Sequence, residues 1–574
     1  MNHPRNIVLL SLLAMILIAC NGTEPEPLPD PDPNATITLD ELGDMEDYEQ
    51  GMVVDSRLFN ELRVNRIVLN DVVYEKPLSL DLTSAGYYRI EVYSGNASGL
   101  LPEVIRLVVL DPERGQAEWA LPPWTPRGVE LQTLAAQKIQ LIHPGAAPAG
   151  QPFPVLVLAE GELTRSLDNF MARVASTDFL VKRGVGSVWL VQGDPSQAAI
   201  SLDQRTLPVS VSAMPGPPRV LGGTLQENLH LEAGSYANID ADLYIPAGVV
   251  MQIDSGAFIT VDPAINIYNQ GILRILGSGH APVVITCSGA EDYWGGFIAT
   301  APESRFEVSH AILGRSGFHT GGDYDWGHAH RQALIYCVQG SVALDHCYMI
   351  DHIGQAIYTE SADLEMEYCL VQRVKTGGQL NGTRVSINHC VFTDFPDDSD
   401  IYRDQDNDGL YLVECVAEIN NSIFMYAKDD CLDSGGGTVD GEVTVRNSRF
   451  ESAFHEGAAL SGGSSAGKTQ HFYNCVFVDC GQGMELGYSS NAHYVFADSC
   501  TFLRNGIGIR YGDNYDFPHR GYISVSNSSS LENTVYDVWN MNREYWAADT
   551  FHMEFDHVLV SSFHPMYPQL MVQE

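Results

Sequence analysis

The sequence predicts an all-β protein whose larger part is a solenoid of stacked β-coils, and two repeated patterns support this prediction. In the first pattern a Cys or Ser recurs with an apolar residue two positions later, and this residue is Phe in the last five copies. The small residues are Cys347, Cys369, Cys390, Ser422, Ser448, Cys475 and Cys500. The second pattern alternates with the first and consists of a polar or acidic residue followed by short runs of apolar residues and Gly.

The two patterns repeat with a period in the low to middle twenties, and Gly, Asn, Asp and Ser separate the short strands. Such a period is typical of stacked β-coils, because one coil cannot bury its own inner face. Stacking places each strand about 4.8 Å from its equivalent in the next coil, where the two pair in parallel. We therefore expect the Phe residues to stack inside the solenoid. We also expect the side-chain amides of Asn421, Asn447 and Asn474 to share hydrogen bonds at a turn.

The repeat resembles the right-handed parallel β-helix proteins, a class that includes pectate lyases, polygalacturonases and many bacterial surface proteins. The resemblance covers residues 219–534 and implies a right-handed parallel β-helix there. It is specific for the fold and leaves the function open, because one fold hosts many activities. The aromatic-rich segment 535–574 is expected to form a C-terminal cap over the last coil.

Residues 1–20 have the pattern of an export signal, with Arg5 near the start and an apolar run from Ile7 to Ile18. The run is too short for a transmembrane helix and fits a signal-peptide core. Its end resembles the lipobox of bacterial lipoproteins, which implies lipidation of Cys20 and attachment to the outer membrane or cell surface of a bacterium. The alternative is an ordinary signal peptide in which Cys20 has no such role.

Three segments are expected between the signal and the solenoid. Residues 21–50 begin with a Pro-rich acidic stretch, which predicts an extended tether. Short strands alternate with turns in residues 51–112 and again in residues 127–213, a pattern typical of two small immunoglobulin-like β-sandwich domains. Neither domain carries a catalytic constellation, so we interpret both as spacers or binding modules.

The 574-residue chain is strongly acidic, with 32 Lys and Arg residues against 73 Asp and Glu residues and a formal net charge of −41. This charge argues against nucleic acid as a partner and leaves the lipid anchor as the one predicted contact with a membrane. It also disfavours a polyanionic polysaccharide unless bound cations change the local sign. The chain has 11 Cys residues, but five of them share a repeat position with Ser422 and Ser448, which predicts buried thiols there.

A column of acidic residues is the first candidate functional site. The residues that begin the second pattern are expected at one position of successive coils: Gln355, Gly377, Asp408, Asp430, Glu456, Gln482 and Asn505. The like charges of Asp408, Asp430 and Glu456 repel at a spacing of about 4.8 Å, which raises pKa values or requires a cation. A solenoid gains no stability from such a column, so we interpret it as functional.

An insertion beside this column predicts a calcium site. The step from Cys390 to Ser422 is 32 residues, against 21 to 27 residues elsewhere in the repeat. Within the insertion, alternating acids followed by Gly match the first half of a calcium-binding loop, although the second half of an EF-hand is missing. The expected calcium ligands are Asp404, Asp406, Asp408 and Asp430. The alternative is a solvated acidic loop.

A second hypothesis uses the same residues for catalysis. The segments 407–409 (Asn-Asp-Gly) and 429–431 (Asp-Asp-Cys) resemble the polygalacturonase pattern of Asn-x-Asp-Gly followed one coil later by Asp-Asp-Cys. The resemblance implies that Asp408, Asp429 and Asp430 supply the general acid and the base that activates water in an inverting hydrolysis. The Gly-His-Gly of the family is shifted here to His455-Glu456-Gly457, and its Arg-x-Lys has no counterpart. The candidate catalytic residues are therefore Asp408, Asp429, Asp430, His455 and Glu456.

Another polar cluster lies in the stretch that follows Phe318. Its residue types suit a transition metal, and two aromatic residues in the same stretch, Tyr324 and Trp326, suit stacking on a sugar ring. The polar members are His319, Asp323, Asp325, His328 and His330. Their spacing matches no motif, so we interpret the stretch as a surface loop.

These patterns lead to three hypotheses for the function. The favoured one is a lipid-anchored surface protein whose β-helix binds an extracellular polysaccharide or cell-surface glycan, with calcium organising the acidic insertion. The second is a glycoside hydrolase or polysaccharide lyase that acts through the carboxyl column. The third is a structural adhesin or spacer.

Overall fold

The structure, a computed structural model, describes most of residues 138–560 and the backbone of seven strands between residues 46 and 110. Within 138–560 the undescribed segments are 161–168, 175–176, 192–197, 203–204, 328–329, 396–406, 436–441, 462–467, 488–492, 513–520, 535 and 541–552. Cys20, residues 21–45 of the expected tether, Asp404, Asp406 and His328 lie outside the described residues. The elements of the described part are all β-strands, as the sequence predicts.

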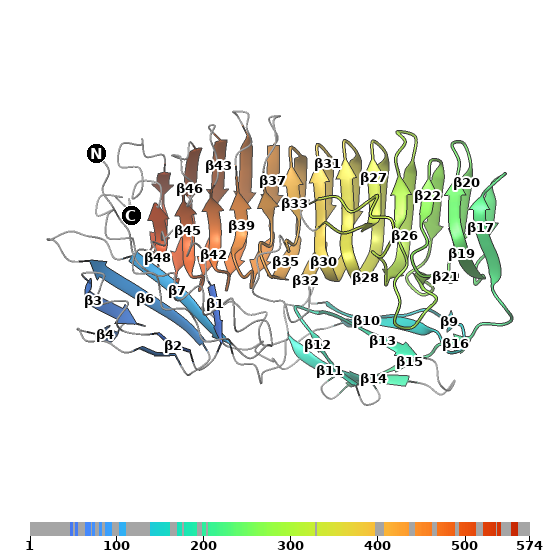
Figure 1. The fold of residues 1–574 in the computed structure, drawn as a ribbon, viewed down its shortest axis with the longest axis horizontal. Coiled ribbons are helices and arrows are strands. Elements are labelled where there is room, and N and C mark those ends of the chain that lie inside the picture. The colour runs from blue at the N-terminus through green and yellow to red at the C-terminus, as the bar shows by residue number, and fades with distance from the viewer. Residues whose placement is uncertain are drawn as a thin grey trace, which may run out of the picture.

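One sheet of 34 strands, from β17 (Arg219–Thr224) to β50 (Leu559–Val560), makes up the larger part of the protein. A strand pairs in parallel with the equivalent strand of the next coil, and most coils contain three strands (Figure 1). This arrangement is consistent with the predicted parallel β-helix. We name its three parallel stacks sheet 1, sheet 2 and sheet 3, in their order along each coil.

Sheet 1 contains β18 (Leu229–Leu231), β20 (Val250–Asp254), β23 (Ile272–Leu276), β29 (Asp363–Glu367), β31 (Arg384–Asn388), β34 (Val416–Asn420), β37 (Glu442–Arg446), β40 (Thr469–Tyr473), β43 (His493–Asp498), β46 (Gly521–Ser526) and β49 (Met553–Asp556). Sheet 2 contains β21 (Phe258–Val261), β24 (Val283–Cys287), β32 (Val391–Phe395), β35 (Ile423–Ala427), β38 (Arg449–Glu451), β41 (Val476–Val478), β44 (Thr501–Leu503), β47 (Ser529–Leu531) and β50.

Sheet 3 contains β22 (Ile267–Asn269), β25 (Phe297–Ala299), β27 (Ala333–Val338), β33 (Tyr411–Val413), β36 (Asp433–Ser434), β39 (Glu456–Leu460), β42 (Gln482–Leu486), β45 (Ile507–Tyr511) and β48 (Tyr536–Asn540). Long strands bend around the corners and take part in more than one sheet: β17, β19 (Tyr236–Ile245), β26 (Arg305–Gly314), β28 (Ser341–Glu360) and β30 (Leu370–Asn381). Strands β48, β49 and β50 lie in the segment expected to be a cap and extend all three sheets.

A column of stacked Phe rings fills part of the interior, as the sequence predicts. The ring centroids of consecutive members lie 4.7, 5.4, 4.8 and 4.9 Å apart, with interplanar angles of 11° or less. The members are Phe392, Phe424, Phe450, Phe477 and Phe502, and all are buried. The neighbouring Cys and Ser residues are buried too, and the ten Cys residues of the described part are free thiols.

The corner between sheet 1 and sheet 2 is a tight turn whose first residue has a positive φ. Asn421, Asn447 and Asn474 occupy this position with φ values of 52°, 50° and 52°, a conformation that Asn tolerates better than most residues. Asn447 Nδ2 donates to Asn421 Oδ1 at 3.3 Å, and Asn474 Nδ2 donates to Asn447 Oδ1 at 2.8 Å. The expected amide ladder is therefore present.

A two-sheet domain covers the outer face of sheet 2. One antiparallel sheet consists of β8 (Lys138–Ile142), β10 (Pro152–Glu160) and β13 (Val185–Val191), and the other of β11 (Phe170–Val174), β12 (Thr177–Val181), β14 (Ala198–Leu202) and β15 (Arg205–Val209). A short parallel pair, β9 (Ala146–Ala147) and β16 (Ser212–Ala213), lies beside them. Figure 1 shows this domain alongside the coils that contain β28 and β30.

Apolar and charged contacts both hold this domain on the solenoid. Its core is continuous with outward residues of sheet 2, among them Phe258, Tyr348, Leu370 and Met425. At the next corner, Lys182 Nζ donates to Asp394 Oδ1 at 2.5 Å, and Arg183 pairs with Glu451. Trp189 Nε1 and Arg373 both donate to Asp351, each at 2.6 Å. The outer face of sheet 2 is therefore unavailable to a ligand over these coils.

The segment expected to form the first sandwich contains two sheets. The five-stranded sheet has the order β1 (Glu46–Glu49), β7 (Glu103–Leu110), β6 (Gly86–Ser94), β3 (Val64–Leu69) and β4 (Val72–Tyr74). Strand β1 comes from the end of the segment expected to be an extended tether, so this part of the prediction is wrong. The pair β2 (Met52–Val54) and β5 (Leu80–Leu82) is antiparallel. Over the described residues, no helix has the length and hydropathy needed to cross a membrane.

Candidate functional site

The acidic column lies at the corner where the chain enters sheet 3. Asp408 precedes β33, Asp430 precedes β36, and Glu456 and Gln482 begin β39 and β42. Asp430 N donates to Asp408 Oδ1 at 3.4 Å, Glu456 N donates to Asp430 Oδ1 at 2.8 Å, and Gln482 Nε2 donates to Glu456 Oε1. All four side chains are buried. The expected column of carboxyl groups on neighbouring coils is thus formed by Asp408, Asp430 and Glu456.

The residues predicted for the two ends of the column are wrong, because Gly377 and Asn505 do not align with the other members. Gln355 aligns with Thr376, not with Gly377, because the register shifts between His352 and Gln355. At the other end Gln482 aligns with Ile507. Asn505 lies two residues before Ile507, in the corner between β44 and β45, where its Oδ1 accepts a hydrogen bond from Cys480 N at 3.0 Å.

Burial and crowding of like charges alter the protonation of Asp430. Burial raises the pKa of this carboxyl group well above its ordinary value, and the neighbouring Glu456, Asp429 and Asp408 raise it further. A buried carboxylate has either to keep a proton or to gain a cation. Without a bound cation, both effects favour the protonated form of Asp430.

Asp429 and His455 stand beside this acid. His455 Nδ1 lies 2.7 Å from Asp429 Oδ1, and both side chains are mostly buried. Asp429, Asp430 and His455 each offer one ligand atom, and these atoms lie within 4.8 Å of one another. The structure thus brings all five predicted catalytic residues to one corner of neighbouring coils.

A buried ion pair next to this corner was not predicted. Arg510 Nη2 contacts Glu485 Oε2 and lies 4.0 Å from Glu456 Oε1. Burial raises the pKa of Glu485 despite the opposing charge of Arg510. On the far side of sheet 3, Lys468 Nζ donates to the carbonyl groups of Ser434 and Gly435, and burial lowers its pKa to about 8. The sequence signal for the pair was available, because Glu485 and Arg510 occupy one position of successive coils.

The predicted calcium site is described only in part. Asp408 and Asp430 have the neighbouring positions that the hypothesis requires, whereas Asp404 and Asp406 lie outside the described residues. Asn407 is buried, and its Nδ2 donates to the carbonyl oxygen of Lys375 at 2.9 Å. The described ligands offer oxygen atoms, which calcium prefers.

Sheet 3 also carries an outward column of aromatic residues that sequence analysis missed. Its successive positions, from the N-terminal coil onwards, are Tyr244, Tyr268, Ile298, Tyr336, Tyr358, Gln379, Tyr411, Asp433, Ala459, Glu485, Arg510 and Trp539. We call this the outer column of sheet 3. Each Tyr stands between two buried residues, such as Leu243 and Ile245, at least one of which is apolar, and this repeat was the signal.

The aromatic half of the outer column is partly open. Tyr244 is 41% exposed and stacks on Tyr268, with ring centroids 4.6 Å apart. Tyr336 and Tyr358 also stack, at 5.0 Å, but both are buried. Tyr324, from the loop after β26, packs against Tyr268 and Tyr336. The open end of the column therefore lies at Tyr244 and Tyr268.

The loop after β26 contains the polar cluster that sequence analysis singled out. Gln355 Nε2 donates to the carbonyl oxygens of Trp326 and Arg331 and so fixes this loop beside sheet 3. Trp326 is 56% exposed. Among the described residues of this loop, no three His, Asp or Glu side chains converge on a common point. The interpretation as a surface loop therefore fits the described part better than a metal site does.

Comparison with known proteins gives little further information. No protein-family model and no curated protein matches the sequence significantly. Tailspike protein 3 of bacteriophage CBA120 aligns over 60% of this chain with 13% identity and a TM-score of 0.30, and the chain covers 56% of that protein. The catalytic unit of the GH87 α-1,3-glucanase from Streptomyces thermodiastaticus aligns over 74% of this chain and 86% of its own, with 9% identity and a TM-score of 0.26.

An alginate lyase from Paenibacillus aligns over 56% of this chain and 99% of its own, with 7% identity and a TM-score of 0.16. At these TM-scores the similarity bears on neither the topology nor the function of this chain.

The raised pKa of Asp430 predicts how this residue affects stability. An unfolded Asp releases its proton near pH 3.9, whereas folded Asp430 keeps it, so the folded state loses stability as pH rises from there to the folded pKa. At pH values above the folded pKa, each unit of the pKa shift lowers the free energy of unfolding by about 1.4 kcal/mol. Asp430→Asn should therefore raise the Tm at pH 8 in the presence of chelator and leave it nearly unchanged at pH 4, as measured by calorimetry.

Glu418→Gln is the matched control, because Glu418 points into solvent from sheet 1. It should shift the Tm little at either pH. Equal stability of the Asp430→Asn variant and the unmodified chain across this range would show that Asp430 is ionised without cost.

Proposed function

We propose that this chain binds an extended glycan along the outer face of sheet 3. The observation that carries the proposal is the outer column, which leads from the exposed ring of Tyr244 and the half-buried ring of Tyr268 to the buried carboxyl cluster on one face. The two-sheet domain covers sheet 2 from β21 to β35, whereas the outer face of sheet 3 carries aromatic side chains and leads to the buried acids.

The shape of the column suits a polymer better than a small ligand. Tyr244 and Tyr411 are six coils apart, which corresponds to roughly 29 Å at about 4.8 Å per coil. Tyrosine presents a flat apolar ring with a polar hydroxyl at its edge. Such rings match the C–H face of a pyranose, and neighbouring amide and carboxyl groups can bind its hydroxyl groups.

The charge of the face favours a neutral glycan. The corner of sheet 3 gathers Asp408, Asp429, Asp430 and Glu456, and the nearby Arg510 is already paired with Glu485. A uronate polymer would bring further negative charge to this corner. A neutral polysaccharide avoids this repulsion, and its hydroxyl groups can donate to the carboxylates.

The sequence also supports a cellular location for the protein. A signal segment that ends in a lipobox-like Cys20 and continues into a Pro-rich tether supports an exported lipoprotein at the bacterial surface. There the solenoid would meet extracellular glycans.

Hydrolysis is a second candidate function, and one observation favours it. Burial and the neighbouring carboxylates raise the pKa of Asp430, whereas the adjacent Asp429 is paired with His455. A carboxylic acid beside a carboxylate is the combination that glycoside hydrolysis requires, one group to protonate the leaving oxygen and the other to activate water.

Binding should depend on the exposed rings. Tyr268→Ala should weaken binding of a neutral polysaccharide about tenfold, equivalent to about 1.4 kcal/mol, because a buried aromatic contact is lost. Affinity electrophoresis against a panel of neutral and uronate polysaccharides measures this change. Tyr494→Ala is the control, because Tyr494 is 41% exposed but points outward from sheet 1. Equal weakening by both variants would argue against sheet 3 as the binding face.

Measuring the release of reducing ends distinguishes hydrolysis of the polysaccharide from binding alone. If the chain is a hydrolase, it releases reducing ends from the polysaccharide it binds, and Asp430→Asn lowers this rate at least 100-fold, the lower range of acid catalysis being about 10². Binding of the polysaccharide should be retained in the variant. A folded, binding-competent chain that releases no reducing ends from any bound polysaccharide would leave binding as the function.

Calcium is the proposed alternative to the proton on Asp430. A calcium ion held by Asp408 and Asp430, with Asp404 and Asp406 from the insertion, would neutralise the crowded carboxylates. Calcium at 100 times its Kd should stabilise the folded chain by about 2.7 kcal/mol, seen as a higher Tm. Asp430→Asn should lose most of this gain, and Glu418→Gln should keep it. An identical calcium response in all three proteins would contradict the site.

A further inference from the structure

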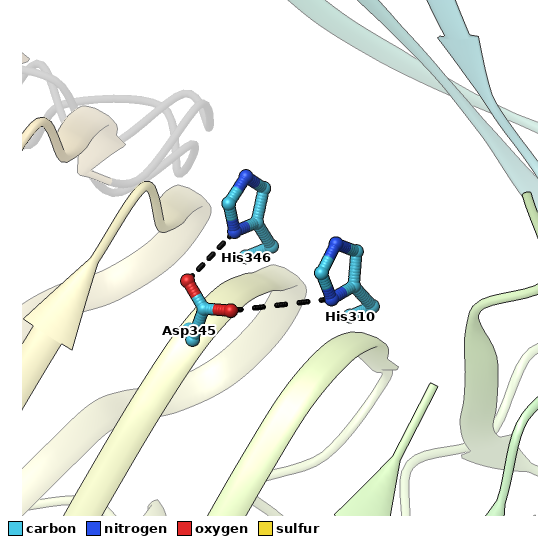
Figure 2. Close-up of side chains that lie close together, drawn as sticks. All are labelled: His310, Asp345 and His346. Carbon is cyan, nitrogen blue, oxygen red and sulfur yellow. Dashed lines mark hydrogen bonds and ion pairs between the residues drawn. The ribbon is translucent and has the colours of Figure 1, made fainter. Parts of the chain in front are cut away.

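A second cluster of potential ligand atoms lies far from the carboxyl column, at the corner between sheet 1 and sheet 2. His310 lies within β26 and His346 within β28, at equivalent positions of neighbouring coils. Asp345 directly precedes His346. Figure 2 shows the Nδ1 atoms of both imidazole rings on the side that faces the Asp345 carboxylate.

The three side chains converge closely. Asp345 Oδ1 lies 2.7 Å from His346 Nδ1, and Asp345 Oδ2 lies 4.0 Å from His310 Nδ1. One ligand atom from each residue can be chosen so that all three lie within 4.8 Å of one another. All three residues are partly exposed, so an ion can reach them from solvent.

We propose that His310, His346 and Asp345 form a binding site for a divalent transition-metal ion such as Zn²⁺. Imidazole nitrogen and a single carboxylate suit zinc, copper or nickel, whereas calcium and magnesium prefer oxygen ligands alone. Three protein ligands leave a further position for water or an external ligand. The site is independent of the glycan proposal, because it lies on a different corner of the solenoid.

The distances fit an ion after a small movement of side chains. Ligand atoms about 2.1 Å from a tetrahedral zinc ion are about 3.4 Å apart, and the two distances from Asp345 lie on either side of this value. The imidazole rings stack with centroids 4.5 Å apart and an interplanar angle of 4°. Because an ion binds in the plane of an imidazole ring, one ring has to rotate about its Cβ–Cγ bond. The corner leaves room for this movement, since both rings are partly exposed.

The backbone holds both His residues in place for this role. Their φ values of 47° and 50° belong to the tight corner, where other coils have Asn, Tyr, Ser or a further His. Parallel pairing on both sides of the corner, Ser309 with Asp345 and Ala311 with Cys347, fixes the two residues on adjacent coils. The stack continues through Tyr368 to His389, but the residue before His389 is Asn388, which offers no carboxylate.

The chain contains a matched control for the second imidazole. Asp556 and His557 repeat the Asp-His pair at the same corner of the last coil, with Asp556 Oδ1 2.6 Å from His557 Nδ1. The coil before has Asn527 at this position instead of a second His. This pair therefore measures what one His and one carboxylate bind without the neighbouring His.

Titration of the full chain with Zn²⁺, after removal of metals with chelator, tests the proposal by calorimetry. His310→Ala and His346→Ala should each weaken Zn²⁺ binding by more than about tenfold, since loss of a ligand costs more than loss of its hydrogen-bond partner. His557→Ala should leave the affinity unchanged. The Tm of each variant without metal should match the unmodified chain and so exclude unfolding as the cause.

Cu²⁺ provides a readout that identifies the ligands. Electron paramagnetic resonance should show hyperfine splitting from two nitrogen atoms in the unmodified chain and from one in His310→Ala. The proposal is overturned if the His310→Ala and His346→Ala variants bind Zn²⁺ as tightly as the unmodified chain. It is overturned equally if His557→Ala removes the binding, or if Ca²⁺ competes with Zn²⁺ at equal concentration.

Discussion

Parallel stacking at about 4.8 Å governs this protein, because each residue lies beside its equivalent in the next coil. This spacing favours columns of identical side chains that contact one another on successive coils. Phe rings stack from Phe392 to Phe502, and an Asn amide donates to the amide of the preceding coil. Such columns stabilise the fold only when uninterrupted, and so the repeat recurs along the sequence.

The same constraint penalises ionised columns, and the structure offsets this cost in several ways. Asp430 keeps its proton, Asp429 pairs with His455, and Glu485 pairs with Arg510 of the next coil. Backbone N–H groups also donate to Asp408 and Asp430. Buried charges need such partners. A corner that requires all of them is costly to maintain, which supports a functional role for the carboxyl groups.

Sequence analysis succeeded where the period was regular and failed where it was not. The spacing placed Asp408, Asp430 and Glu456 together, because the strands on either side pair without a break. It misplaced Gly377 because the strand register shifts near Gln355. It misplaced Asn505 because the residue equivalent to Gly483 is Gly508 and not Gly506. The outer Tyr column was missed, because a Tyr between two apolar residues looks like part of a core. Glu485 and Arg510 were missed because their pairing depends on the register.

The outer faces of the three sheets differ, and the difference supports sheet 3 as the proposed binding face. Sheet 1 alternates buried residues with exposed polar ones, as in β29 and β34, which suits contact with water. Sheet 2 is covered by the two-sheet domain through apolar contacts and the Lys182–Asp394 pair. On sheet 3, strands β42 and β45 are buried on both faces. Their outer side chains, Glu485 and Arg510, pair with each other beside the carboxyl corner. We infer that the buried charged side chains of sheet 3 belong to a functional site. The Tyr rings of the outer column lie on the same face and lead to it.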